Sequence, residues 1–96
     1  MKILVLNCGS SSIKFQLIEM TSQTVLADGI VERIGEKSAL YTYKSQAFTV
    51  KKSERCIEDH KQGIQIILDE LLNKEHGVVA EISEITAVGH RLVHAG

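Results

Sequence analysis

Residues 3–15 of the 96-residue chain read ILVLNCGSSSIKF: an apolar run, a turn rich in hydroxyl groups, and a segment in which apolar and polar residues alternate. The apolar run predicts a buried strand, and the alternation after the turn predicts a second strand rather than a helix. The glycine lets a ligand approach the backbone, the serines offer hydroxyl donors, and the lysine offers a positive charge. This strand–turn–strand unit is therefore a candidate phosphate-binding turn.

The turn differs from the Walker A loop. That motif requires a second glycine directly before the lysine and a helix after it. Here no second glycine precedes Lys14, and the residues that follow it have the period of a strand. The phosphate candidate therefore lies in a hairpin, which is a different architecture.

Composition narrows the class of protein. The chain is 44% hydrophobic, carries a formal net charge of −1 and has no basic block, which favours one small soluble domain and disfavours nucleic-acid binding. The first apolar run is too short for a signal peptide, and no apolar stretch has membrane-spanning length, so we expect a cytoplasmic protein without a membrane partner. Cys8 and Cys56 make no disulfide framework. Cys8 is either a reactive thiol or a small half-buried filler beside Gly9.

The rest of the chain predicts further strands and one helix. A bend or bulge is expected at Asp28–Gly29 and a helix C-cap at Gly77. The helix is indicated by apolar residues at positions 64, 67, 68, 71 and 72, which form one stripe. Strands are predicted at 3–7, 13–20, 25–34, 40–43, 47–51 and 86–90, and the helix at 57–74. This order predicts an α/β layered domain.

Two separated motifs resemble the signatures of the acetate kinase family. The first is N-x-G-S-S-S-x-K-F at residues 7–15, and the second is G-H-R-x-V-H at residues 89–94. The residues between them are similar as well, so the resemblance runs over the whole chain. Two motifs in the right order are far more specific than a lone Gly-Ser-Ser-Ser.

The resemblance implies an α/β ribonuclease H-like fold of the actin-like ATPase superfamily, with β-hairpins and a mixed sheet packed by a helix. Residues 1–96 would be the N-terminal part of the first ribonuclease H-like domain, with the second domain absent from this chain. In that family the turn of the first hairpin faces a cleft between two domains. The resemblance also implies a homodimer for the intact enzyme.

The implied activity is transfer of the ATP γ-phosphoryl group to acetate, which gives acetyl phosphate and ADP reversibly and with Mg²⁺. We expect the N-terminal fragment alone to be inactive. A propionate or other short-chain carboxylate kinase is an alternative, since it shares both motifs. A non-catalytic nucleotide- or phosphate-binding module is another, if 96 residues are the whole protein.

The resemblance assigns roles to residues of the first motif. Lys14, Ser10 and Ser12 would bind the ATP phosphates, and Asn7 would be a ligand of Mg²⁺. Each has a plainer interpretation. Lys14 could be a solvated residue on the outer face of a strand, Asn7 could stabilise the turn through its own backbone, and the serines could do no more than satisfy the turn.

The second motif supplies the expected carboxylate site. Arg91 would be catalytic and would bind the carboxylate, because a guanidinium grips a carboxylate or a transferring phosphoryl group through two hydrogen bonds. Val93 would line a pocket for the methyl group of the substrate. Without this context, Arg91 would be taken as a partner in a surface ion pair.

The four histidines offer no zinc site. His90 and His94 would lie roughly 13 Å apart along a strand at about 3.3 Å per residue. His60 and His76 are expected to be surface or capping residues.

Overall fold

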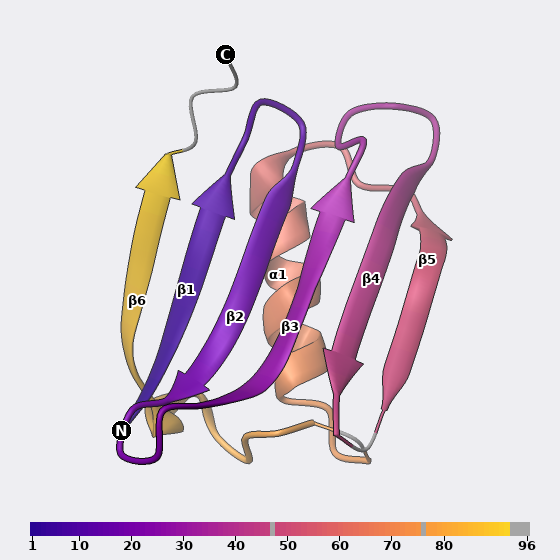
Figure 1. Ribbon diagram of the computed structural model, residues 1–96. Helices are drawn as coiled ribbons and strands as arrows, with labels where there is room; N and C mark the ends of the chain where they lie inside the picture. The colour runs from indigo at the N-terminus through magenta and orange to yellow at the C-terminus, as the bar shows by residue number, and fades with distance from the viewer. Residues whose placement is uncertain (47, 76, 93–96) are drawn as a thin grey trace.

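The computed structural model describes residues 1–46, 48–75 and 77–92, and of residues 90–92 the backbone alone. A six-stranded sheet carries one α-helix across one of its faces (Figure 1). The strands are β1 Lys2–Cys8, β2 Ile13–Glu19, β3 Thr24–Glu32, β4 Ala39–Ser45, β5 Thr49–Arg55 and β6 Ile85–Leu92; the helix is α1 His60–Leu71, and a 3-10 turn, η1, spans Ile82–Glu84.

The sheet is mixed. Its strand order is β5-β4-β3-β2-β1-β6. The first five strands form an antiparallel meander, and β6 pairs in parallel with β1. A parallel neighbour needs a crossover connection, which α1 supplies here. The predicted α/β class, with hairpins, a mixed sheet and a packing helix, is therefore confirmed.

The core lies between the sheet and α1. Alternate residues of each central strand face the helix, as the period of two requires. From α1, Ile67 and Leu71 are fully buried against the sheet, and the other three residues of the predicted stripe pack beside them. Buried hydrophobic residues are Leu4, Leu6, Ile13, Phe15, Leu17, Ala27, Val31, Ile34, Ala39, Tyr41, Tyr43, Ile57, Ile67, Leu71 and Val79.

Gly29 is needed for packing within β3. A Cβ atom there would lie 2.1 Å from the Thr42 carbonyl oxygen and 2.8 Å from the Phe15 ring. Glycine therefore leaves room for the ring. The predicted bend at Asp28–Gly29 is wrong, because pairing with β2 is regular there. The register shifts instead between Leu17 and Ile18, opposite Ala27 and Val25.

The helix is shorter than predicted. It begins at His60 rather than at residue 57, because Asp59 has extended backbone and its carboxylate accepts the Gln62 N–H at 2.9 Å. It ends at Leu71, with Leu72 as the C-cap. The predicted cap at Gly77 is wrong, since that residue comes five positions later and its N–H donates to the Asn73 carbonyl.

The strands β1, β4 and β6 extend beyond both ends of their predicted ranges, and β3 ends at Glu32 rather than at residue 34. The predicted strand at 47–51 is displaced: β5 begins at Thr49 and ends at Arg55, and residue 47 lies outside the described residues. Within the described part of the chain, no helix has the length and apolarity needed to cross a membrane.

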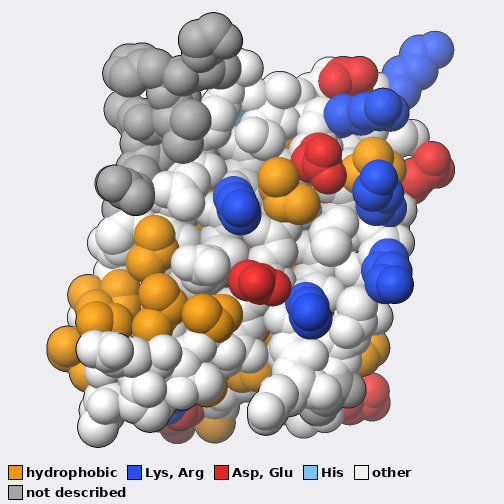
Figure 2. Space-filling view, viewed as in Figure 1, with side chains coloured by type: hydrophobic (Ala, Val, Ile, Leu, Met, Phe, Trp, Pro, Cys, Tyr) orange, Lys and Arg blue, Asp and Glu red, His pale blue; other side chains and the backbone are white. Residues whose placement is uncertain are grey.

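The face of the sheet opposite α1 is turned to the viewer in Figure 2. Hydrophobic side chains gather at one end of this face, near the start of β1. Ile3 and Ile18 are register partners there and are half-buried, as is Val5. Towards the turn between β1 and β2 the same face becomes polar, with Asn7 and Lys14 as the next members of the alternation.

Candidate phosphate-binding site

The hairpin turn between β1 and β2 is tight and joins the ends of two inner strands of the sheet (Figure 1). The Gly9 N–H donates to the Ser12 carbonyl at 2.8 Å, which closes the turn over Ser10 and Ser11. A Cβ atom at Gly9 would lie 2.8 Å from the Ser12 hydroxyl oxygen. Glycine therefore lets this hydroxyl fold back over the turn. Ser10 and Ser11 are exposed and Ser12 is half-buried.

Three predicted site residues occupy one row across adjacent strands. Asn7 of β1 is the register partner of Lys14 in β2 and of Arg91 in β6. Residues directly opposite one another in neighbouring strands lie about 5 Å apart. Residues 84 positions apart in sequence are thus brought next to one another, directly beside the turn. This is an arrangement that the sequence motifs did not specify.

The described side chains of this row differ in exposure. Lys14 is exposed and Asn7 is half-buried. Both alternate with the core residues Ile13 and Leu6, so they belong to the helix-free face. For Arg91 the structure gives the backbone position only, and Val93 lies outside the described residues, as do His94 and His76.

The turn is anchored from two other elements. His60, the first residue of α1, places its Nε2 atom 2.8 Å from the Gly9 carbonyl oxygen. The Ile34 N–H, from the loop after β3, donates to the Ser11 carbonyl at 2.9 Å. The expectation that His60 is a surface or capping residue is therefore wrong: it is half-buried, and Asp59 is the cap.

Gly63 brings α1 close to the base of the hairpin. A Cβ atom on Gly63 would lie 3.0 Å from the Cδ1 atom of Ile13, the first residue of β2. Glycine inside a helix costs about 1 kcal/mol relative to alanine, and here it permits this close approach. The start of the helix and the turn thus form one packed unit.

A magnesium ion would find few protein ligands here. Over the ranges that the structure describes, no three His, Cys, Asp or Glu side chains come together as a metal-binding group. The Asn7 amide oxygen fits Mg²⁺ as one ligand, because this ion usually keeps several waters and binds substrate phosphates alongside one or two protein oxygens. Next to Lys14, a cation would also need phosphate charge to offset the repulsion.

The cysteines divide by burial. Cys8 is half-buried and packs against the core, whereas Cys56 is exposed, and both are free thiols. The packing of Cys8 favours its interpretation as a filler beside the turn.

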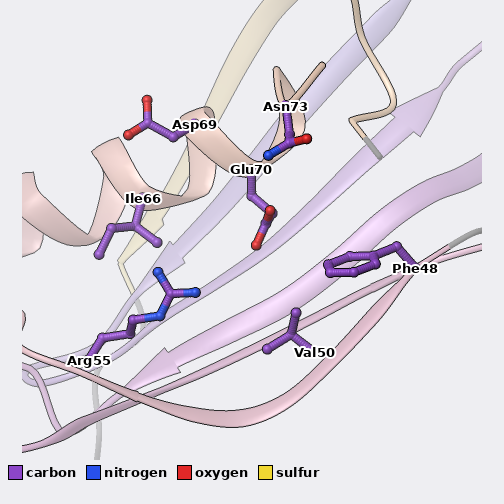
Figure 3. A pocket seen from close by; sticks show the side chains of 7 residues that line it. All are labelled: Phe48, Val50, Arg55, Ile66, Asp69, Glu70 and Asn73. Carbon is purple, nitrogen blue, oxygen red and sulfur yellow. The ribbon is translucent and has the colours of Figure 1, made fainter. Parts of the chain in front are cut away.

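A separate hollow of about 370 Å³ lies between α1 and β5 (Figure 3). The guanidinium of Arg55 lies 5.4 Å from the centre of the Tyr41 ring at this place. Burial raises the pKa of Tyr41, and the nearby Glu70 charge raises it further. The lining residues are Phe48, Val50, Arg55, Ile66, Asp69, Glu70 and Asn73. None of them is a predicted site residue, so this hollow is distinct from the turn.

The fold and the turn together define a class of protein. An antiparallel meander, a crossover helix and a parallel strand beside β1 form the α/β sheet of the actin-like ATPase superfamily, which is ribonuclease H-like.

The model of the acetokinase family matches residues 2–96, and the chain belongs to this family. An acetate kinase of Clostridium acetobutylicum is 55% identical over 96 residues, which cover all of this chain and 24% of that protein. The crystal structure of Porphyromonas gingivalis acetate kinase superimposes with a TM-score of 0.87 at 41% identity, over 99% of this chain and 24% of that one. A propionate kinase from Francisella tularensis gives a TM-score of 0.75 at 35% identity, over 99% of this chain and 23% of that one. The chain thus spans about a quarter of the length of the relatives it matches.

Sequence reasoning missed the two anchors of the turn. His60 is separated from Gly9 by 51 residues, and no local pattern reports such a distance. The only available signal was the Asp59-His60 pair at the start of an apolar stripe, which marks a helix N-terminus but not its neighbour. Ile34 acts through its backbone N–H, so its side chain carries no signal at all.

Proposed function

We propose that this chain is the amino-terminal part of an acetate kinase, which transfers the γ-phosphoryl group of ATP to acetate and gives acetyl phosphate and ADP. Membership of the acetokinase family and identity above 50% to acetate kinases support the proposal. The observation that carries it is the row formed by Lys14, Asn7 and Arg91 on three adjacent strands beside the turn.

This reaction places few covalent demands on the protein. A carboxylate oxygen of acetate attacks the γ-phosphorus, and the bond from that phosphorus to the bridging oxygen breaks, with its electron pair leaving on ADP. Positioning and neutralisation of charge supply most of the catalysis in phosphoryl transfer. A substrate carboxylate is itself the nucleophile, so no catalytic triad is required.

The proposed roles follow the chemistry of each group. Lys14 and the hydroxyls of Ser10 and Ser12 bind the ATP phosphates. Mg²⁺, with the Asn7 oxygen as a direct or water-mediated ligand, neutralises phosphate charge when bound.

The carboxylate side belongs to the second motif. Arg91 is a catalytic residue that binds the acetate carboxylate and the phosphoryl group during its transfer. Val93 contacts the methyl group of acetate. The register of Arg91 opposite Asn7 supports this assignment, because a carboxylate bound by Arg91 would then lie near a phosphate bound beside the turn.

We further propose that residues 1–96 are part of a first ribonuclease H-like domain, and that a second domain completes the cleft in a cytoplasmic homodimer. The share of the relatives that the chain covers supports the first part of this proposal, that residues 1–96 are one part of a longer protein. Residues 1–96 alone should then give no turnover.

The test is carboxylate-dependent formation of acyl phosphate by the complete polypeptide, trapped as the hydroxamate, with Mg-ATP and with acetate, propionate or butyrate. We expect acetate to have the highest kcat/KM, and each added methylene to lower it roughly tenfold or more, since a methylene in a fitted pocket is worth about 1–3 kcal/mol.

Two results would contradict the proposal in different ways. Equal or better turnover with propionate would make the protein a propionate kinase, like the Francisella tularensis structural neighbour. Binding of Mg-ATP without turnover of any carboxylate would favour a nucleotide-binding module.

A further inference from the structure

His60 and Gly9 form a contact that joins the helix to the turn. The His60 Nε2 atom lies 2.8 Å from the Gly9 carbonyl oxygen, and the ring is partly buried. A carbonyl oxygen only accepts hydrogen bonds, so Nε2 carries the proton and donates it. The imidazole is thereby tied to the backbone of the turn at the residue that has the greatest conformational freedom.

Fixing this carbonyl fixes the next N–H group. The C=O of Gly9 and the N–H of Ser10 belong to one planar peptide unit, and the described peptide bonds are all trans. In a trans unit the two groups point in opposite directions. Because the Gly9 carbonyl points towards His60 at the start of α1, the Ser10 N–H points away from His60.

The hydrogen bond from the Ile34 N–H orients a second peptide unit of the turn in the same way. The Ser11 carbonyl accepts the Ile34 N–H at 2.9 Å, so the Ser12 N–H also points away from its anchor. A glycine-containing turn without such contacts could flip its peptide units at little cost. With them, the N–H groups are oriented before any anion arrives, which lowers the free-energy cost of binding it.

We propose that His60 is a positioning residue for the nucleotide phosphates, acting through the Gly9 carbonyl to hold the turn in its binding conformation. This inference rests on the proposed function of the turn and assigns His60 no contact with the substrate. Loss of the hydrogen bond weakens ATP binding and leaves the carboxylate site unchanged.

The test uses three variants of the complete polypeptide. In His60→Gln the side-chain amide nitrogen takes the place of Nε2 and can still donate to Gly9. In His60→Asn the amide nitrogen takes the place of Nδ1 and cannot reach. His60→Ala removes the donor altogether. We expect the KM for ATP to rise about tenfold in the Ala and Asn variants and less than threefold in the Gln variant, with the KM for acetate unchanged.

Leu71→Ala is the control for stability. It removes a buried side chain from the far end of α1, so it should destabilise the fold without changing the KM for ATP. A similar rise in that KM for the Leu71 variant would show that His60 acts only through stability, and would overturn the proposal. Equal KM values for ATP in the Gln and Asn variants would overturn it as well, whether both values rise or both stay at that of the unmodified protein.

Two further readouts keep the test decisive. A nitrogen-15 imidazole spectrum of the unmodified protein should show His60 protonated at Nε2, and the opposite neutral tautomer would contradict the hydrogen bond even if no variant folds. If the unmodified protein shows no acetate-dependent turnover, the proposed function fails. The Kd for Mg-ATP of the same variants then tests the inference alone, with the same order expected.

Discussion

Phe15 and Gly29 show how closely single residues determine this fold. They are register partners in β2 and β3, and the Phe15 ring occupies the space that a side chain at Gly29 would fill. Phe15 follows Lys14, so the same strand holds a core residue and a proposed phosphate ligand on opposite faces. An error in the packing of Phe15 would therefore move the site.

Substitution of Gly29 by alanine should lower the free energy of unfolding by about 1–3 kcal/mol, the usual range for overpacking. The new Cβ atom would lie 2.1 Å from the Thr42 carbonyl oxygen, which is backbone and cannot move aside cheaply. Urea denaturation of the complete protein measures the change. Gly89→Ala is the matched control in β6, where a Cβ atom would have nothing within 4 Å. An equal loss in both variants would contradict the packing argument.

The periodic elements were predictable, and their ends were not. The apolar stripe of α1 and the alternation of β2 can be recognised in the sequence, because each periodicity repeats over several residues. The ends depend on single contacts: Asp59 starts the helix three residues later than predicted, and the Phe15 ring, rather than a bend, explains Gly29. At the site, the sequence motifs were enough to predict Lys14, Asn7 and Arg91 as candidate residues. That the three lie in one row depends on strand pairing, which the motifs do not report. The position of His60 beside the turn depends on a contact between residues 51 positions apart.

The start of α1 offers a direct test of that helix. The Asp59 carboxylate accepts the Gln62 N–H, and the Gln62 side chain in turn accepts the Glu58 N–H at 3.0 Å. Asp59→Ala should lower the free energy of unfolding by about 1 kcal/mol, and Asp59→Asn, which keeps a capping oxygen, by much less. Thermal unfolding of the complete protein compares the two variants. Equal losses would show that the cap is not the source of the stabilisation.

The 3-10 turn η1 should make the start of β6 sensitive to acid. Backbone N–H groups of Glu81 and Ala80 donate to Glu84, and Lys2 lies beside it, so the pKa of Glu84 is held below its ordinary value of 4.5. A lowered carboxyl pKa in the folded state stabilises the fold above pH 4.5, and this contribution is lost as the pH falls through the lowered value.

Glu84→Gln should therefore lower the urea midpoint at pH 7, and the difference from the unmodified protein should shrink as the pH falls below 4.5 and through the lowered pKa of Glu84. Glu54→Gln, at an exposed position of β5, is the control and should leave the midpoint unchanged. A difference that persists in acid would exclude the charge of Glu84 as its origin.

Taken as a whole, the molecule is a sheet with one covered and one bare face (Figures 1 and 2). The bare face passes from hydrophobic residues near the start of β1 to Asn7 and Lys14 beside the turn. The relatives are about four times as long as this chain, and the proposed cleft would form where the polar end of this face meets the rest of such a protein. The proposed phosphate and carboxylate sites and the His60 contact would then lie together beside the turn between β1 and β2.

The most direct test of this account is the kinetics of Lys14→Ala in the complete polypeptide, with Lys44→Ala as control. Both lysines are exposed on the helix-free face, and Lys44 lies in β4, two strands from Lys14. Loss of a charged hydrogen-bond donor to phosphate is worth about 1.5–3 kcal/mol. We therefore expect kcat/KM for ATP to fall roughly tenfold to a hundredfold in the Lys14 variant and to stay unchanged in the Lys44 variant. Equal values for the two variants would contradict the assignment of the turn as the site of phosphate binding.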